Sequence, residues 1–381
     1  MVQQIGLEWL LRDIIYLSVP LIYITKNKKT MFRTKTHSIN AMAANSLVEE
    51  LQQFFVYKLN TVLCSQKKDS CFEAIEWFRD QGQHGGGIRY AANNAKLFNR
   101  GSVNVSQIHY DDNEDKALAS ATALSTIIHP LNPYAPSVHM HISWTEMKNG
   151  KGYWRMMADL NPAIENAQAT IAFSDCLKQA TSSLYQAGSA QGDRYFHIPA
   201  LDRHRGVSHF YLEDYSSGNL QADFNLAKNL GYSVINTYVD LFQQAIQNQQ
   251  NLTDEDYNKQ LAYHTLYLFQ VLTLDRGTTS GLLVHNQNDL GIMGSLPAQI
   301  DKTLLASWQK KLASPQDQLL SALIQVLPDQ SPCPINDETK LALAQTIRQH
   351  YTKYPKALSL QAQGNVIPPT VENHAVQSSL A

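Results

Sequence analysis

The chain has 381 residues, of which 44% are hydrophobic and 17% are charged, and its formal net charge is −2 at pH 7. This length and composition are typical of a soluble globular protein with a large core, organised as one large domain or two smaller ones. The near-neutral charge and the lack of a Lys/Arg cluster argue against nucleic acid or an anionic membrane as the main partner.

The N-terminal residues contain an apolar, uncharged run from Ile14 to Thr25. The run is too short to span a bilayer, and its basic residues follow it instead of preceding it, so we expect neither stable membrane insertion nor a secretory signal. Residues 1–44 are expected to be an extension that is flexible or results from a start assigned too early, with Met31 or Met42 as the true start. A membrane anchor is the alternative.

The first predicted elements are a long helix and a group of hairpin strands. Residues 45–64 place apolar side chains at helical spacing, with Asn45 or Ser46 as the N-cap. Residues 85–110 mix short alternating runs with Asn-Asn and Arg-Gly turns, which is typical of hairpins. The "GGG" at residues 85–87 predicts a flexible turn where the backbone must come close to another group.

The segment "SVHMHIS", residues 137–143, predicts a β-strand. Because side chains alternate along a strand, His139 and His141 should point to the same face. Two such imidazoles can be a metal pair, a proton-handling site, or polar residues on the wet side of a sheet, and the spacing alone leaves all three open.

Beyond residue 162 the pattern changes to long amphipathic helices and further strands. The predicted helices cover residues 165–187, 219–248 and 254–269, a strand covers residues 205–215, and a strand and turn cover residues 272–284. Helices interleaved with alternating strands favour an α+β fold, in which a large, mainly antiparallel sheet is flanked on both faces by helices. We expect one domain over residues 45–355 and a disordered polar tail over residues 356–381.

Common catalytic motifs are missing from the sequence. No Walker loop, Rossmann fingerprint, HExxH or GxSxG occurs, and the four cysteines form no CxxC pair. Because no cysteine pair has the spacing of a zinc or redox motif, we expect the thiols to be reduced, as is typical of a cytoplasmic protein.

Several ordered blocks nevertheless carry a resemblance. In chain order they are "GGGIRY", "RGSVNVSQIH", "STIIHPLNPYAPSVHMHISW", "ADLNP", "HRGVSHFYLEDY", "LDRGTTSGL" and "IMGSLP". Their order and spacing resemble the signature blocks of oxygen-dependent coproporphyrinogen III oxidase. The full set is far more specific than any one block, because "DRG" or "HP" alone carries no information.

The resemblance implies a flat antiparallel sheet flanked by helices, a homodimer, and a tetrapyrrole as the small-molecule partner. It implies an oxidative decarboxylation that converts two propionate side chains of coproporphyrinogen III to vinyl groups in heme and porphyrin biosynthesis. Oxygen is then the co-substrate, no organic cofactor is required, and a divalent transition metal stays open. Two alternatives also stay open: a paralogue with a different oxidative or metal-dependent reaction on another substrate, and a non-catalytic tetrapyrrole-binding homologue.

The resemblance assigns roles residue by residue. His139 falls on the family's proposed acid/base histidine, and Asp159 falls on the aspartate of its "DLTP" block. Asp275 and Arg276 fall on the "DRG" pair that faces the tetrapyrrole, with Asp275 as the acceptor of pyrrole N–H groups. The other matches are Ser125 and Arg205 in substrate binding and His129, together with His139, as metal ligands.

The sequence also departs from the family pattern. The family's "HxNxR" strand has His141 and Ser143 here, so an arginine suited to bind a propionate is missing. Arg155 stands where the family keeps a small residue, and its charge can compensate from the neighbouring strand. We therefore expect His141, Ser143 and Arg155 in substrate binding. Two of the four histidines proposed as metal ligands in the family are absent.

Each matched residue also has an ordinary structural interpretation. The Asp275–Arg276 pair can close a turn, and Asp159 can cap the residues that follow it. His129 can simply end a strand, and Arg205 can be a surface charge.

Overall fold

The computed structural model describes residues 31–65, 72–92, 97–249 and 251–374. The chain divides into a short unit, residues 1–31, and a large unit, residues 32–381. Most residues of the predicted N-terminal extension therefore lie outside the described residues, and so does Cys71, one of the four cysteines. In the part of the chain that the structure describes, no helix is both long enough and apolar enough to cross a bilayer.

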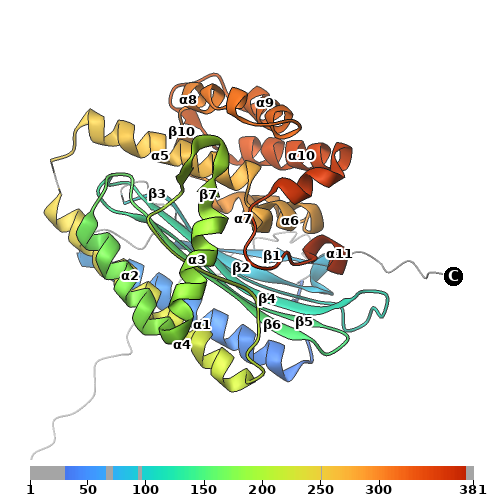
Figure 1. Ribbon diagram of the computed structural model, residues 1–381. Coiled ribbons are helices and arrows are strands. Elements are labelled where there is room, and N and C mark those ends of the chain that lie inside the picture. The colour runs from blue at the N-terminus through green and yellow to red at the C-terminus, as the bar shows by residue number, and fades with distance from the viewer. Residues whose placement is uncertain (1–30, 66–71, 93–96, 250, 375–381) are drawn as a thin grey trace, which may run out of the picture. The chain divides into compact units, whose positions relative to one another are not determined.

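A seven-stranded sheet forms the centre of the large unit (Figure 1). All neighbouring strands are antiparallel, in the spatial order β1-β2-β3-β4-β5-β6-β9. The strands are β1 (Phe72–Phe78), β2 (Gly85–Ala92), β3 (Phe98–His109), β4 (Leu118–Pro130), β5 (Ser137–Met147), β6 (Gly152–Asn161) and β9 (Ser208–Tyr215). The chain runs as consecutive hairpins as far as β6, and β9 then joins the sheet as its last strand.

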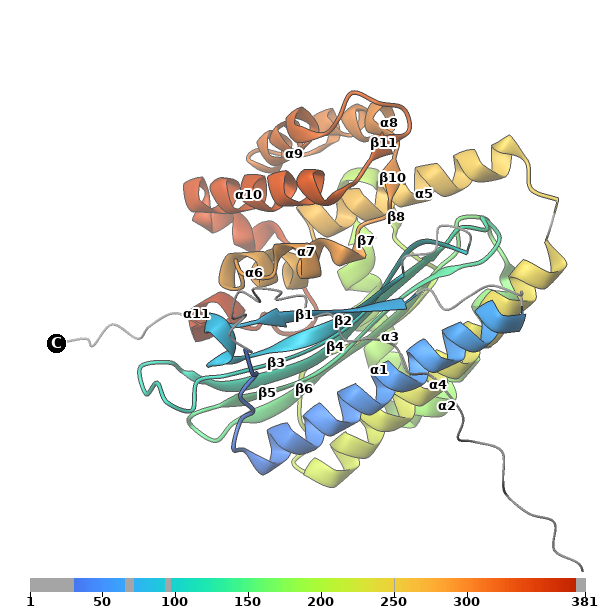
Figure 2. The same ribbon diagram turned by 180° about the vertical axis from the view of Figure 1, so that it is seen from behind.

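One face of the sheet packs against long helices. These are α1 (Ile39–Ser65), α2 (Ala167–Thr181) and α4 (Leu220–Asn248), which lie together on the same side of the sheet (Figures 1 and 2). Alternate strand residues such as Leu124, Met140 and Ile142 are fully buried in this core. Because successive side chains alternate, the residues between them point to the opposite face of the sheet.

The part of the chain after α4 lies on that opposite face (Figure 2). It has its own apolar core, in which Leu268, Leu272 and Leu282 are fully buried. Its helices are α5 (Asp254–Thr273), α6 (Arg276–Val284), α7 (Asp289–Ile292), α8 (Lys302–Ser307), α9 (Gln316–Val326), α10 (Asp337–Lys353) and α11 (Thr370–His374), while α3 (Tyr185–Phe196) packs along β9. The short strands are β7 (His197–Ile198), β8 (Arg203–His204), β10 (Gln299–Ile300) and β11 (Cys333–Pro334).

The predicted α+β class with a large antiparallel sheet is confirmed, and so are the hairpins and the strand that carries His139. The first helix begins earlier than predicted, at Ile39. The stretch 165–187 forms two helices instead of one, because the chain turns at Ser182, whose φ of 47° cannot continue a right-handed helix.

The "GGG" at residues 85–87 begins strand β2 and does not form the predicted flexible turn. The predicted close backbone approach is present, since a Cβ on Gly87 would lie 2.1 Å from the carbonyl oxygen of Val105. Only glycine leaves room for the backbone of β3 at this position.

The stretch 272–284 is mostly helical and is not the predicted strand and turn. α6 starts after Asp275, whose carboxylate accepts a hydrogen bond from the backbone N–H of Thr278 at 2.6 Å. This cap satisfies an N–H group that has no partner within the helix, and it outweighs the low helix propensity of the glycines and threonines.

Residues 356–374 do not form the disordered tail predicted from their composition. Gln361 is buried, and its amide donates hydrogen bonds to the hydroxyl groups of Thr279 and Tyr351. The following helix α11 packs against α6. Polar contacts therefore hold a segment that has no apolar stripe, and such contacts leave no periodic pattern in the sequence. Residues 375–381 lie outside the described residues.

The packing of α3 on β9 depends on a small residue at position 188. A Cβ on Gly188 would lie 2.2 Å from a ring carbon of Phe210, which is fully buried. We expect Gly188→Ala to lower the free energy of unfolding by about 1–3 kcal/mol, because overpacking outweighs the gain in helix propensity. Gly281→Ala in α6 is the control, since its nearest atoms lie 3.6–3.7 Å away. Urea denaturation that gave both variants the same stability would contradict this.

Candidate active site

A pocket with a volume of about 260 Å³ lies between the polar face of the sheet and the helices that follow α4. Side chains of β3, β4, β5, β6 and β9 form one wall, and side chains of α5, α6, α7 and α11 form the other. His139 and His141 both line the first wall, so their predicted common orientation is confirmed. Their neighbours on β5, Met140 and Ile142, point into the apolar core behind the sheet.

His139 is held by a buried carboxylate. It lies directly opposite Asp159 across β5 and β6, and its Nδ1 is 3.0 Å from the Asp159 carboxylate. Asp159 is fully buried and also accepts hydrogen bonds from Arg205 at 2.9 Å and from Asn161 at 2.6 Å. Nη2 of Arg205 is also 3.2 Å from Nδ1, but it donates at 2.9 Å to Asp159. Because the carboxylate only accepts, we assign the proton of the imidazole to Nδ1, which leaves Nε2 available to the pocket.

The charge of Asp159 is stabilised by its partners. Burial alone would raise the pKa of this carboxyl group, but the Arg205 charge and the contacts with His139 and Asn161 lower the pKa of Asp159 to about 2. Asp159 is therefore ionised at physiological pH and fixes both the position and the tautomer of His139.

Arg205 is a fully buried side chain and not a surface charge. Its guanidinium group lies 4.4 Å from the ring centroid of Phe196 and 4.8 Å from that of Tyr267. It also donates a hydrogen bond to the side-chain oxygen of Gln270 at 2.9 Å. Arg205 thus contacts the site from behind His139 and does not line the pocket.

Arg155 supplies positive charge within the pocket. It stands directly opposite Ser143 on the neighbouring strand, and its Nε lies 3.3 Å from the buried carboxylate of Glu213. Burial acts against this charge, but Glu213 outweighs the burial and raises the pKa of Arg155. Among the described residues that line the pocket, Arg155 is the only lysine or arginine.

Asp275 faces the pocket from the start of α6. Besides capping the helix, its carboxylate accepts a hydrogen bond from the hydroxyl group of Tyr195 at 3.0 Å. The same hydroxyl oxygen accepts hydrogen bonds at 3.4 Å from Arg155 and from the backbone N–H of Gly277. Tyr195 therefore links the carboxylate on α6 to the guanidinium group on β6.

The remaining predicted substrate contacts line the same wall. The Nε2 of His141 is 3.0 Å from the hydroxyl group of Ser143, and Ser125 lies opposite His141 on β4. Burial and the nearby Arg155 charge lower the pKa of His141 well below its ordinary value. His141 is therefore neutral at physiological pH.

Four predicted site residues do not line the pocket: Asp159 and Arg205, which lie behind His139, and His129 and Arg276. His129 is fully buried, with Nδ1 at 2.9 Å from the hydroxyl group of Ser137 and Nε2 at 3.2 Å from the carbonyl oxygen of Ser295. Arg276 donates a hydrogen bond to the carbonyl oxygen of Leu358 at 3.0 Å. The structure therefore brings His139 and Asp275 together at the pocket, with Asp159 and Arg205 behind His139, and places His129 and Arg276 outside the pocket.

The possible metal site receives no support from the donor geometry. Within the ranges that the structure describes, no group of three or more His, Cys, Asp or Glu side chains is arranged to hold a metal ion. Both ring nitrogens of His129 are engaged with protein groups. The residues present do not fit the metal that the resemblance left open.

Several residues of the site were not identified from the sequence. Glu213 was predictable, because alternation along "HFYLEDY" places it on the same face as Tyr211 and His209. Tyr195 and His374 gave no such signal. They reach the pocket region through the packing of α3 and α11, which no periodicity encodes.

Comparison with known proteins identifies the family. Residues 43–327 match the profile of the family described as Coproporphyrinogen III oxidase. This stretch covers most of the chain, and the chain belongs to this family.

Individual relatives carry the same name. The oxygen-dependent coproporphyrinogen-III oxidase of Rattus norvegicus, mitochondrial, is 27% identical over 281 residues, which are 67% of this chain and 61% of the relative. The enzyme of Drosophila melanogaster is 27% identical over 66% of this chain and 69% of the relative, and that of Rickettsia bellii is 27% identical over 61% and 86%. This chain thus spans less than two thirds of the length of the rat relative.

The buried ion pair between Asp159 and Arg205 should be critical for the stability of the fold. We expect Asp159→Asn to lower the free energy of unfolding at neutral pH by about 3–5 kcal/mol, because it leaves the Arg205 charge buried without a counter-charge. The control Glu76→Gln removes a partly exposed ion pair with Arg33 and should cost less than about 1 kcal/mol. Urea denaturation measures both, and a loss for Asp159→Asn as small as that of the control would contradict the predicted role.

The effect of Asp159 should also depend on pH. Its pKa is about 2 in the folded chain and ordinarily 3.8, so it contributes stability above the ordinary value that is lost as the pH falls towards 2. The stability difference between the wild type and Asp159→Asn should therefore shrink by about 2 kcal/mol over that range. Denaturation curves at a series of pH values measure it, and a constant difference would show that Asp159 is not the titrating group.

Proposed function

We propose that the protein is an oxygen-dependent oxidoreductase that decarboxylates propionate side chains of a tetrapyrrole, with coproporphyrinogen III as its substrate, in heme and porphyrin biosynthesis. The observation that carries this proposal is His139, which presents Nε2 to the pocket while a buried, ionised Asp159 holds Nδ1. A histidine fixed in this way can accept and return protons at a defined point in the pocket.

The chemistry assigns a role to each group. A propionate becomes a vinyl group when its carboxyl group leaves the α carbon as carbon dioxide and the β carbon, which is bonded to the pyrrole, loses a hydride. The hydride and the carboxyl proton reduce O2 to hydrogen peroxide. We assign the proton transfers to His139. Asp275 accepts the pyrrole N–H groups, supported by the hydrogen bonds from Tyr195 and Thr278 that hold its carboxylate in place.

Arg155 binds one carboxylate of the substrate. It lies opposite Ser143, where the family has an arginine, and side chains opposite each other in an antiparallel pair are about 5 Å apart at Cβ. Compared with the family pattern, the positive charge therefore lies on the neighbouring strand, β6, and is still in the pocket. Burial raises the pKa of Glu213, so protonation of this carboxyl group on substrate binding would free Arg155 for the substrate.

The proposal extends to the assembly and the location of the protein. A homodimer and the absence of an organic cofactor are supported by the family resemblance, with oxygen as the co-substrate. A cytoplasmic location is supported by the bacterial relative, whereas the name of the rat relative includes "mitochondrial". A metal ion is not part of the proposal.

An activity assay tests the proposal directly. Purified protein should consume coproporphyrinogen III and oxygen and form protoporphyrinogen IX, measured by oxygen uptake and by the fluorescence of the oxidised product. His139→Gln should lower kcat about 100-fold or more with a smaller change in KM, because it removes the acid/base group. His197→Gln is the matched control, since His197 does not line the pocket.

Two results would contradict the proposal. One is a wild-type protein that neither consumes coproporphyrinogen III under air nor binds a porphyrin in an absorbance titration. The other is a His139→Gln variant with the kcat of the control.

A further inference from the structure

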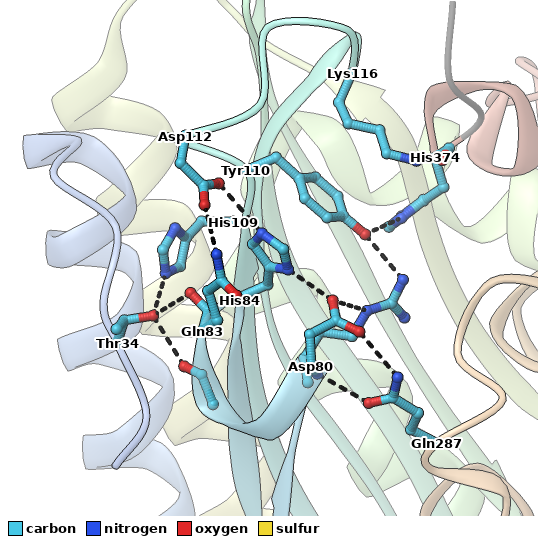
Figure 3. A network of polar contacts seen from close by, with 12 residues as sticks. Thr34, Asp80, Gln83, His84, His109, Tyr110, Asp112, Lys116, Gln287 and His374 are labelled. Carbon is cyan, nitrogen blue, oxygen red and sulfur yellow. Dashed lines mark hydrogen bonds and ion pairs between the residues drawn. The ribbon is translucent and has the colours of Figure 1, made fainter. Parts of the chain in front are cut away.

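A second group of polar side chains lines the pocket at the end of α6 that is remote from Asp275. His285 follows the last residue of α6, and His374 ends α11. Their ring centroids are 5.1 Å apart, with the ring planes at 86°. Figure 3 shows His374 next to Tyr110 and Lys116, which lie at and beyond the end of β3. None of these residues has a role in the site around His139.

Arg79 fixes the protonation of His285. A guanidinium group only donates hydrogen bonds, so Nδ1 of His285, 2.9 Å from Nη1 of Arg79, must accept. The ring proton of His285 then lies on Nε2. A second nitrogen of Arg79, Nη2, donates to the hydroxyl oxygen of Tyr110 at 3.0 Å.

Tyr110 passes the same constraint to His374. Its oxygen already accepts from Arg79, so its own proton is free to be donated to Nδ1 of His374, 3.4 Å away (Figure 3). With this donor assignment the ring proton of His374 lies on Nε2. One arginine therefore orients two imidazoles so that both present the same kind of donor.

Both imidazoles are neutral donors without an acceptor. Burial, His374 and Arg79 lower the pKa of His285 well below its ordinary value, and burial, Arg79 and Lys116 lower the pKa of His374 to about 4. Neither Nε2–H group has a hydrogen-bond partner among the residues described by the structure, although both rings line the pocket.

The surroundings favour an anion at these donors. Arg79 lies behind both rings, and Lys116 donates a hydrogen bond to the carbonyl oxygen of His374 at 2.5 Å. The Asp80 carboxylate, 3.4 Å from Nε of Arg79 and 2.6 Å from Nδ1 of His84 (Figure 3), balances the charge of Arg79, and Lys116 adds a positive charge beside His374. Two N–H donors on rings whose centroids are 5.1 Å apart, with the Arg79 guanidinium group next to His285, are suited to the oxygens of a carboxylate.

The rest of the pocket has few groups for an anionic ligand. Arg155 is the only lysine or arginine among the described lining residues, and it is paired with Glu213. Asp275 and His285 stand at opposite ends of α6, ten residues and therefore about 15 Å apart along the helix. A ligand with carboxylates around a macrocycle can contact Arg155 with one of them and this histidine pair with another.

We propose that His285 and His374 form a second carboxylate-binding subsite, in which their two Nε2–H groups hold a side-chain carboxylate of the substrate. The identity of the ligand rests on the proposed function. α11 lies beyond residues 43–327, which match the family, so His374 belongs to a part of the chain outside that match. The subsite thus combines His285, inside the matched stretch, with His374, outside it.

Binding of coproporphyrin III, the stable oxidised form of the substrate, tests the subsite. In absorbance titrations the H285L/H374L variant should bind it at least about tenfold more weakly than the wild type, because hydrogen bonds to a charged group are lost. H285Q/H374Q keeps an N–H donor at each position and should bind within about threefold of the wild type. H197L is the control for loss of a histidine outside the pocket, and thermal melting checks that each variant is folded.

The tetramethyl ester of coproporphyrin III separates a carboxylate contact from general packing. It should bind equally to the wild type and to both double variants. The subsite is overturned if H285L/H374L binds the free acid as tightly as the wild type, or if it loses the same factor of affinity for the ester and the acid.

A separate measurement distinguishes failure of the subsite from failure of the proposed function. If the wild type neither binds coproporphyrin III nor oxidises coproporphyrinogen III, the proposed function fails. Titration with propionate, followed through the imidazole ¹⁵N resonances, then tests the subsite alone. Shifts of Nε2 in both His285 and His374 support it, and unchanged resonances at saturating propionate overturn it.

Discussion

The ion pair between Asp159 and Arg205 is the interaction on which the site depends. Both side chains are fully buried, and two charges removed from water are stable only when their partners are complete. Asp159 has His139 and Asn161, whereas Arg205 has Gln270 and two aromatic rings. The pair connects β6, the segment before β9, and α5. Besides its effect on stability, the pair orients His139, because Asp159 holds one nitrogen of the imidazole and leaves the other to the pocket.

The same strands build the apolar core and the pocket. On β5, Met140 and Ile142 belong to the core under α1 and α4, while His139, His141 and Ser143 line the pocket. A slip of one residue would exchange the two sets and bury the histidines among apolar side chains, so the core fixes the register of the site. Packing on the apolar face of the sheet therefore also keeps these polar residues together on the opposite face.

The sequence predicted features that depend on local order. The strand of His139, its shared face with His141, and the hairpins follow from alternation, and the family blocks marked Asp159 and Asp275. Features that depend on long-range contacts were not predictable. The burial of Arg205 requires α5 behind it, the cap at Asp275 turns a β-like sequence into helix α6, and the polar segment after residue 356 is held by buried amide contacts.

Under the proposed function, charge distribution explains how this member of the family can differ from the family pattern and still bind an anionic substrate. An arginine is missing at Ser143, and an arginine is present directly across the strand pair at Arg155, where Glu213 balances it. A binding charge that moves by one strand displaces the carboxylate it holds, so a rigid macrocycle must shift or tilt in the pocket. Contacts at the other end of the ligand must then change as well. The neutral pair His285 and His374 lies at that end of the pocket. These imidazoles, close to Arg79, can donate hydrogen bonds to a carboxylate in a shifted position, and they add no fixed charge to the pocket.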